Sequence, residues 1–467
     1  MKIFGKQDDL NRVSTPGGDI TLFSLFIPIF IELILKNLMS TVNVLILGRY
    51  SDNAVASVGV ASQLINMFIM FFAVVSTGAT VIISQNLGAG NKKYASEVSA
   101  VSVVLTTTFA IFLGAIFTLF APQVMKLMQL EQKLLPDAIA YFRIAVSFSF
   151  FSAASTALSA VCRSYGRANT SMVVSLVMNI LNAAGNYIIV FRPFNTPFSG
   201  ASGVAAARVA SEFIAFLVMV VLVRRMKLGL DFKSLLPIPI QTMKSILQMG
   251  LPSGVQSLSY NISQLVSTSI IAVLGAVALS SKIYVQSIIF FVYIMGLALG
   301  QTTALMVGRL VGAGEYDRAY RLNIRNLKIA VTLNILFSII VITLRYKLIS
   351  LFTTNPEIIA LSTVIMSIDV LVEAFRAFNH IEQNSLRGAG DVHFPMKIAL
   401  ISSWAISIPF SYFFGIVLGL GLFGCWIAFA MDEMFRGTLL FLRWRSKEWM
   451  TKSLVMNNER NETVTNG

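Results

Sequence analysis

The sequence predicts an all-α polytopic membrane protein with about twelve transmembrane helices, arranged in two six-helix lobes that are related by a parallel internal repeat. Composition is the first reason. Hydrophobic residues make up 56% of the 467 residues and charged residues 12%, and the mean hydropathy is +0.75. A soluble chain of this length needs more charge on its surface. The second reason is that the apolar runs reach the roughly 20 residues that cross a bilayer as a helix.

The third reason is that the two halves of the chain repeat each other at a constant spacing. Pro28 and Pro252 stand 224 positions apart. The same offset relates Gly88-Ala89-Gly90 to Gly312-Ala313-Gly314, Arg163 to Arg387, Gly166 to Gly390, and Met172 to Met396. The offset becomes 221 for Glu212 and Glu433. Matches that stay in register over this length indicate an internal repeat.

The apolar runs also give the expected element boundaries. Helices are expected near 21–48, 55–86, 95–120, 137–162, 170–192, 199–223, 246–274, 278–308, 320–345, 357–386, 394–417 and 422–443. Six helices return the chain to its starting side, so both halves enter the membrane in the same direction, with a cavity between them. The predicted domains are an N-terminal tail at 1–20, an N-lobe at 21–223, a basic linker at 224–245, a C-lobe at 246–446, and a polar, disordered tail at 447–467.

Charge and cysteine usage narrow the class further. The net charge is +14, and lysine and arginine gather in the loops of one side, which places both termini in the cytoplasm by the positive-inside rule. That distribution favours a membrane protein over a nucleic-acid partner. The first apolar run has no cleavage site and is expected to remain as a helix. With two cysteines in or beside apolar segments and two histidines, the sequence predicts no metal site and no cofactor.

Several motifs carry a family resemblance that covers about 21–446. The run PIFIELILKNLMSTVNVLILGRYSDNAVASVG, followed by GATVIISQNLGAGNKKYA, resembles the first two helices of the MATE family, the multidrug and toxic compound extrusion transporters. The second half has the matching LPSG and MVGRLVGAGEYDRAY, and then SLRGAGDVHFPM. The resemblance implies a secondary antiporter, not an enzyme, in the bacterial cytoplasmic (inner) membrane.

Such a transporter exports amphipathic, often cationic, organic compounds by alternating access around a central cavity, while H+ or Na+ flows in. Its expected partners are these small molecules and membrane lipid, and it is expected to be monomeric. A lipid-linked oligosaccharide flippase of related architecture is the alternative. The interior basic residues are few and mostly have acidic neighbours, which disfavours a site for pyrophosphate.

The tenth predicted helix carries the main candidates for cation coupling. Asp369, Glu373, Arg376 and His380 are spaced by 4, 3 and 4 residues, so they share one helix face. An ionised residue at mid-bilayer costs about 2.5–3.5 kcal/mol, so this stripe needs partners, a wet cavity or a function. Glu373 is the first candidate to carry the coupling ion, and a static ion pair with Arg376 is the other interpretation.

The first helix offers a second candidate, Glu32, with Lys36 one turn away. It can carry a proton, contact the substrate, or form a structural pair. The resemblance implies an aspartate five residues before Gly48, where this chain has Asn43. It also implies an acid in the fifth helix, where the chain has an amide cluster that cannot titrate, formed by Asn179, Asn182 and Asn186.

Aromatic and polar residues are the candidates for the substrate cavity, through stacking and cation–π contacts. These are Phe148, Phe151, Gln256, Tyr260, Phe291, Tyr293 and Met295. Arg163 and Arg387 stand at inner helix ends and are expected to anchor loops. Glu212, Asp432, Glu433 and Arg436 are expected to have structural roles near the cytoplasmic ends.

Overall fold

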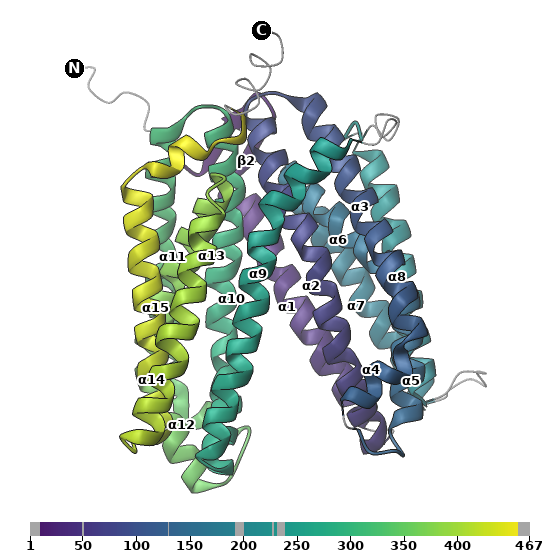
Figure 1. The fold of residues 1–467 in the computed structure, drawn as a ribbon, viewed down its shortest axis with the longest axis vertical. Helices are drawn as coiled ribbons and strands as arrows, with labels where there is room; N and C mark the ends of the chain where they lie inside the picture. Colours follow the sequence, from purple (N-terminus) through teal and green to yellow (C-terminus); the bar gives the residue numbers. More distant parts are fainter. Residues whose placement is uncertain are drawn as a thin grey trace. The chain divides into compact units, whose positions relative to one another are not determined.

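The structure is a computed structural model that describes residues 10–48, 51–128, 130–191, 200–226, 228–230 and 239–455. Parts of the predicted tails and of the linker lie outside these residues. The helices of the first half are α1 (Leu22–Gly48), α2 (Asp52–Gly88), α3 (Lys92–Leu119), α4 (Ala121–Leu127), α5 (Leu135–Ser147), α6 (Ser149–Ser164), α7 (Ala168–Phe191) and α8 (Gly200–Arg225) (Figure 1).

The second half has a matching set of helices. They are α9 (Ile240–Val273), α10 (Ala276–Gly312), α11 (Tyr316–Ser350), α12 (Pro356–Gly388), α13 (His393–Ile401), α14 (Ile408–Tyr412) and α15 (Gly421–Arg445). Two π-helical turns, η2 (Ser402–Ser407) and η3 (Phe413–Val417), continue α13 and α14, so that His393–Val417 is one span. The predicted fold class is confirmed.

The apolar content of these helices suits a bilayer. Among the described residues, nine helices are long and apolar enough to cross a membrane. The pair α5 and α6, bent by 47° at the break between them, gives a tenth span if the two helices cross the membrane as one. The helices α9 and α15 have the length of a span and a more polar composition, which in α15 includes Asp432, Glu433 and Arg436.

The chain divides into two compact units. One contains Met1–Leu22, Ser84–Gly90 and Pro252–Gly467, and we call its described residues the C-lobe unit. The other contains Phe23–Ile83 and Asn91–Leu251, and we call it the N-lobe unit. In the C-lobe unit, α12 packs against α10, α11 and α15. In the N-lobe unit, α8 packs against α5, α6 and α7.

The internal repeat is visible in the backbone. Gly90 and Gly314 both have a left-handed conformation, with φ of +82° and +76°, and each donates its N–H three residues back, to Leu87 and Val311. Gly166 and Gly390 form a second such pair, with φ of +79° and +96°. A left-handed residue after a helix favours glycine because a Cβ would clash there.

The end of α2 crosses the end of α10 within the C-lobe unit through another pair of equivalent glycines. A methyl group on Gly88 would overlap the carbonyl oxygen of Arg309. A methyl group on Gly312 would overlap the carbonyl oxygen of Gln85, which is 224 positions before Arg309. The two close approaches are therefore related by the repeat, and each requires a residue without a side chain.

Two expectations need correction, and one element was not predicted. The helix predicted at 137–162 is broken, because Phe148 leaves helical geometry and its ring stacks on Phe151, with 6.4 Å between the ring centroids. The polar N-terminal tail contains a hairpin, β1 (Arg12–Thr15) and β2 (Gly18–Thr21). The tail expected to be disordered begins with a 3-10 helix, η4 (Glu448–Lys452), because Trp449 is buried and stacks on Trp444.

Candidate functional site

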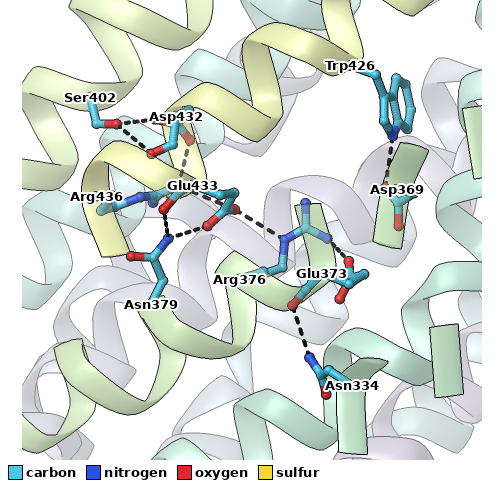
Figure 2. A network of polar contacts seen from close by, with 10 residues as sticks. All are labelled: Asn334, Asp369, Glu373, Arg376, Asn379, Ser402, Trp426, Asp432, Glu433 and Arg436. Atoms are coloured by element: carbon cyan, nitrogen blue, oxygen red, sulfur yellow. Dashed lines mark hydrogen bonds and ion pairs between the residues drawn. The ribbon is translucent and has the colours of Figure 1, made fainter. Parts of the chain in front are cut away.

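The predicted stripe on α12 is buried inside the C-lobe unit. Glu373 is 0% exposed and Asp369 is 4% exposed, while Arg376 retains 21% exposure of its side chain. The helix that carries the stripe packs against α15, and Asp369, Glu373 and Arg376 belong with residues of α15 to the network that Figure 2 shows. The four positions therefore share one face, as their spacing predicts.

Arg376 is the centre of this network. Its Nη1 donates to Glu373, one turn away on α12, and the two form an ion pair. Its Nε donates to Oε1 of Glu433 on α15 at 3.2 Å. A single guanidinium group therefore binds two carboxylates from different helices, so a change at one carboxylate alters the field at the other.

On α15 the network contains acids for which the sequence analysis expected a structural role and not a place in the site. Arg436 Nη2 lies 2.6 Å from Asp432 Oδ2 and 3.4 Å from Glu433 Oε1. Asn379 donates to Oε2 of Glu433 and also, at 3.0 Å, to its backbone oxygen. Ser402 of η2 donates to Oδ1 of Asp432. The helices α12, α15 and η2 are thereby joined through polar side chains (Figure 2).

The remaining members of the stripe have other partners. Asp369 accepts a hydrogen bond of 2.8 Å from the indole nitrogen of Trp426. The His380 ring lies edge-on to Tyr293, with 5.0 Å between the centroids. Neither ring nitrogen of His380 has a hydrogen-bond partner within the described part of the chain. His380 therefore belongs to the stripe by position but does not bond to Arg376.

The acids in this region outnumber the basic groups. Four carboxyl groups (Asp369, Glu373, Asp432 and Glu433) face two guanidinium groups, of Arg376 and Arg436, which leaves two carboxyl groups in excess. In addition, Oε2 of Glu373 is buried and has no hydrogen-bond partner among the residues that the structure describes. A buried, uncompensated carboxylate is unfavourable, so this arrangement favours the binding of protons or cations.

A cavity of ≈ 170 Å³ opens beside the network inside the C-lobe unit. Asp369, Arg376 and Glu433 contribute to its wall. Glu373 is not part of the wall and is linked to it through its ion pair with Arg376. Its aromatic lining consists of Tyr260, Phe290, Tyr293, Trp426 and Phe429. Two of the predicted cavity residues, Tyr260 and Tyr293, are thus placed next to the predicted coupling residues.

The other predicted cavity residues lie elsewhere. Phe291 is 57% exposed on α10, two residues before Tyr293, and Met295 is partly buried outside this cavity wall. Phe148 and Phe151 belong to the N-lobe unit, where they form an aromatic cluster with Phe150, Phe213 and Phe216 at the bend between α5 and α6. Aromatic residues at different positions of one helix point in different directions, so composition alone could not separate those that line the cavity from those that do not.

Glu32 on α1 is fully compensated by basic groups. Lys36 Nζ lies 2.9 Å from Oε1, as the spacing predicts. Arg163 at the end of α6 donates to both oxygens, at 3.1 and 3.0 Å. Arg163 was expected to anchor a loop, and the structure shows a contact that this expectation did not include, since its guanidinium reaches α1 and fixes the Glu32 carboxylate. This geometry supports a structural role for the pair.

Gln256 and Arg387 occupy the corresponding positions in the second half. Arg387 donates to Oε1 of Gln256 at 2.6 Å, and Gln256 donates to Oε1 of Gln383 at 2.9 Å. Arg387 too reaches the first helix of its own half instead of only closing its loop. Gln256 was a candidate for the substrate cavity, and the structure places it in this contact outside the wall of the C-lobe cavity.

The predicted amide cluster forms in the N-lobe unit. Asn186 donates to Oδ1 of Asn43 at 2.7 Å and to Oδ1 of Asn182 at 3.1 Å. Asn179 instead donates to the backbone oxygen of Ser175 in its own helix. Asn43, Asn179 and Asn182 line a largely apolar cavity of ≈ 200 Å³ between α1 and α7. Among the described residues, no acid lines this cavity.

Sequence reasoning missed how the acids of α15 are used. Glu433 and Arg436 were expected to form a structural pair near the inner end, but both belong to the Arg376 network. The repeat offered a signal, because Glu212 is the counterpart of Glu433. Glu212 pairs with Arg208 at 3.0 Å in the N-lobe unit. An acid at the same buried place in both halves indicates a basic partner in each.

Comparison with known proteins identifies the family. The sequence model of the MatE family matches residues 28–188 and 252–413, which are equivalent stretches of the two halves. The chain is a member of the MatE family of transporters. The resemblance stated from the motifs is thereby confirmed, as are the two repeated lobes.

Relatives of this MatE-family chain are similar over nearly its full length. The uncharacterized transporter YisQ of Bacillus subtilis is 39% identical over 436 residues, covering 93% of this chain and 96% of the relative. The probable multidrug resistance protein NorM of Thermotoga maritima is 30% identical and covers 94% of each chain. A crystal structure of MATE in the straight conformation has a TM-score of 0.85 at 20% identity, over 92% of this chain and 96% of that one.

Proposed function

We propose that this transporter exports amphipathic organic cations from the bacterial cytoplasm in exchange for protons, with both termini in the cytoplasm and the C-lobe network as the coupling site. One observation carries the proposal. Two excess buried carboxyl groups lie beside an aromatic-lined cavity on membrane-spanning helices. Aromatic faces and carboxylates together suit an organic cation. Relatives described as probable multidrug resistance proteins support the same class of substrate.

Arg376 provides a means of coupling, because it binds Glu373 and Glu433 at once. A proton on Glu373 weakens that pair and leaves Arg376 to neutralise Glu433 in the cavity wall. Loss of the proton draws Arg376 toward Glu373 and leaves Glu433 available to a cation in the cavity. A proton and an organic cation therefore oppose each other's binding, and this coupling is reciprocal. Such antagonism is what exchange by alternating access of the two lobes requires.

Sodium is the other candidate ion for the same site. The uncompensated Oε2 of Glu373 can bind a proton directly. A sodium ion would need several oxygen ligands around it, and the polar contacts of Glu373 here are the guanidinium of Arg376 and the amide of Asn334, which donates to the Glu373 backbone oxygen at 3.3 Å. Because both contacts come from donor groups and neither is an oxygen ligand, they disfavour a sodium ion at Glu373 relative to a proton.

Transport in liposomes tests the proposal. The purified full-length protein would be reconstituted, and ethidium movement followed by fluorescence under a pH gradient and, separately, a sodium gradient. Glu373→Gln is the test variant, and Glu357→Gln is the control, because Glu357 is an exposed residue at the start of the same helix.

We expect the pH gradient to drive ethidium movement in the wild type and in Glu357→Gln, but not in Glu373→Gln. If only the sodium gradient drives ethidium movement, the coupling ion is Na+ and not the proton. An intact pH-driven signal in folded Glu373→Gln would remove Glu373 from the coupling site. If neither gradient moves the cation, export of organic cations is the wrong function.

A further inference from the structure

Glu382 is a buried acid that lies outside the network and the cavity described above. It is on α12, with 0% exposure. Both carboxylate oxygens accept from Nδ2 of Asn323 on α11, at 3.0 and 3.2 Å. Oδ1 of Asn323 in turn accepts from Oγ of Ser385, one turn beyond Glu382, at 2.6 Å. Glu382 therefore sits in a closed junction of neutral side chains.

No basic group compensates Glu382 within the part of the chain that the structure describes. The side chains that bond to this junction from α11 and α12 are an amide and a hydroxyl group. Five basic groups on the helices that pack here bond to other partners. Arg309 of α10 contacts Thr15, Arg325 of α11 contacts Asn11, and Arg387 of α12 contacts Gln256. On α15, Arg436 contacts Asp432 and Arg443 contacts Asp391. An ionised carboxylate left without a basic partner in a membrane helix is energetically unfavourable.

The next turn of α11 adds an unused acceptor to the same helix face. Asn326 stands three residues after Asn323 and is also 0% exposed. Its Nδ2 donates to Oγ1 of Thr303 on α10 at 3.0 Å. Its Oδ1 has no hydrogen-bond partner among the described residues. The same face of α11 thus carries two buried amides, one bonded to α12 and the other to α10, and the second has an unused acceptor.

The Asn323 side chain can satisfy either protonation state of Glu382. In the orientation described, its NH2 group donates to the carboxylate and its oxygen accepts from Ser385. If the amide turns over, its oxygen accepts from a protonated carboxyl group and its NH2 group donates to the Ser385 oxygen, since a hydroxyl group can act both ways. The same three residues therefore accommodate Glu382 with and without a proton.

We propose that Glu382 is a second proton-binding site of the C-lobe unit. In the closed junction it holds the proton as a neutral carboxyl group, with the Asn323 amide turned over so that its oxygen accepts from the O–H. On opening, the O–H bond breaks, the electron pair stays on the carboxylate, the proton passes to aqueous solvent, and the amide turns back so that its NH2 group donates to the carboxylate. The contribution of this proton to transport rests on the proton coupling proposed above, but its presence on Glu382 does not.

Infrared difference spectroscopy on the purified full-length protein tests this directly, because the C=O stretch of a protonated carboxyl group is distinct from carboxylate bands. Spectra at neutral pH would compare the wild type with Glu382→Gln, and with Glu357→Gln as the exposed control on the same helix. We expect the wild type minus Glu382→Gln to show one protonated-carboxyl band that shifts in D2O. The Glu357→Gln difference should show carboxylate bands only.

Carboxylate bands alone in the Glu382→Gln difference would overturn the proposal. If Glu382→Gln does not fold, Ser385→Ala provides a second test, because loss of the hydroxyl that holds Asn323 should shift the frequency of the Glu382 band. An unchanged carboxyl region in folded Ser385→Ala would also overturn it. The assay needs no transport, so a protonated Glu382 in a protein that moves no cation would refute the proposed function and leave this site standing.

Discussion

Equivalent arginines in the two halves of the chain bind chemically different partners. Arg163 binds the carboxylate of Glu32, and Arg387 binds the amide of Gln256. In each case the arginine at the end of a helix reaches the first helix of its own half, across 131 residues. The shared geometry indicates an anchor that both halves need. The difference shows that the charge of the partner is not what the anchor requires.

The comparison extends to the polar interiors. In the N-lobe unit, Glu32 has two basic partners, and the amides Asn43, Asn182 and Asn186 bond to one another. In the C-lobe unit, four carboxyl groups share two guanidinium groups. A compensated or neutral interior has no need to bind a proton, whereas an acid-rich interior does. We therefore infer that the repeat supplied two equivalent scaffolds and that the C-lobe specialised in cation coupling.

The largest expected effect separates the two acids that the sequence offered as coupling residues. Glu373→Gln should reduce the pH-driven component of ethidium transport to background, because the variant has no carboxyl group at that position to carry the proton. Glu32→Gln keeps hydrogen-bonding capacity toward Arg163 and should lower transport far less in protein that folds. Equal losses in the two variants, normalised to folded protein, would break the proposed division between the lobes.

The anchors themselves should differ in their effect on stability. Arg163→Ala leaves Glu32 buried with only Lys36, and breaking a buried ion pair costs about 3–5 kcal/mol, with the lower end expected here. Arg387→Ala leaves a neutral amide oxygen unpaired, which costs about 1–3 kcal/mol. Melting temperatures in detergent should therefore fall more for Arg163→Ala. The opposite order would show that the arginine of the C-lobe does more than anchor.

The glycine crossing tests the symmetry of the repeat. Gly88→Ala and Gly312→Ala each push a methyl group into a backbone carbonyl oxygen, and such overpacking costs about 1–3 kcal/mol. The two variants should lower the melting temperature by similar amounts. Gly59→Ala is the control, because nothing lies within 4 Å of a Cβ at that helical position. It should be neutral or raise the melting temperature, and a drop as large as that of Gly88→Ala would contradict the crossing.

The smallest effect on stability is expected when the partner of Arg387 is changed to the residue type that Arg163 binds. Gln256→Glu gives Arg387 a carboxylate partner like that of Arg163, but it loses the hydrogen bond to Gln383. The gain and loss should nearly cancel, leaving a stability change within about 1 kcal/mol. A large fall in melting temperature on this exchange would show that the two anchors are not equivalent.

Local spacing predicted some of these contacts and missed the others. The pairs Glu32–Lys36 and Glu373–Arg376 follow from neighbouring turns of one helix. The contact of Arg376 with Glu433 joins residues that are 57 positions apart and lie on different helices, so no local sequence pattern predicts it. Helix bounds followed from apolar runs. The bend at Phe148 depends on how aromatic rings pack, and no proline or glycine marks it.

The N-terminal hairpin was predictable from signals that were present. The residues Thr15-Pro16-Gly17-Gly18 form a turn, and Gly18 has a φ of +110°. Val13 and Ile20, on either side of it, pair across the two strands and are buried. The short length and polar composition of the tail concealed this pattern. Glu382 was missed because it lies two residues from the predicted stripe and has no charged neighbour in sequence to indicate a pair.

Proton release on substrate binding tests the central claim most directly. Ethidium would be added to purified protein in weakly buffered detergent solution, and the released protons measured with a pH-sensitive dye for the wild type, Glu373→Gln and Glu32→Gln. The account predicts release from the wild type and from Glu32→Gln, and none from Glu373→Gln. Release that disappears in Glu32→Gln and persists in Glu373→Gln would place coupling in the N-lobe unit and contradict the account.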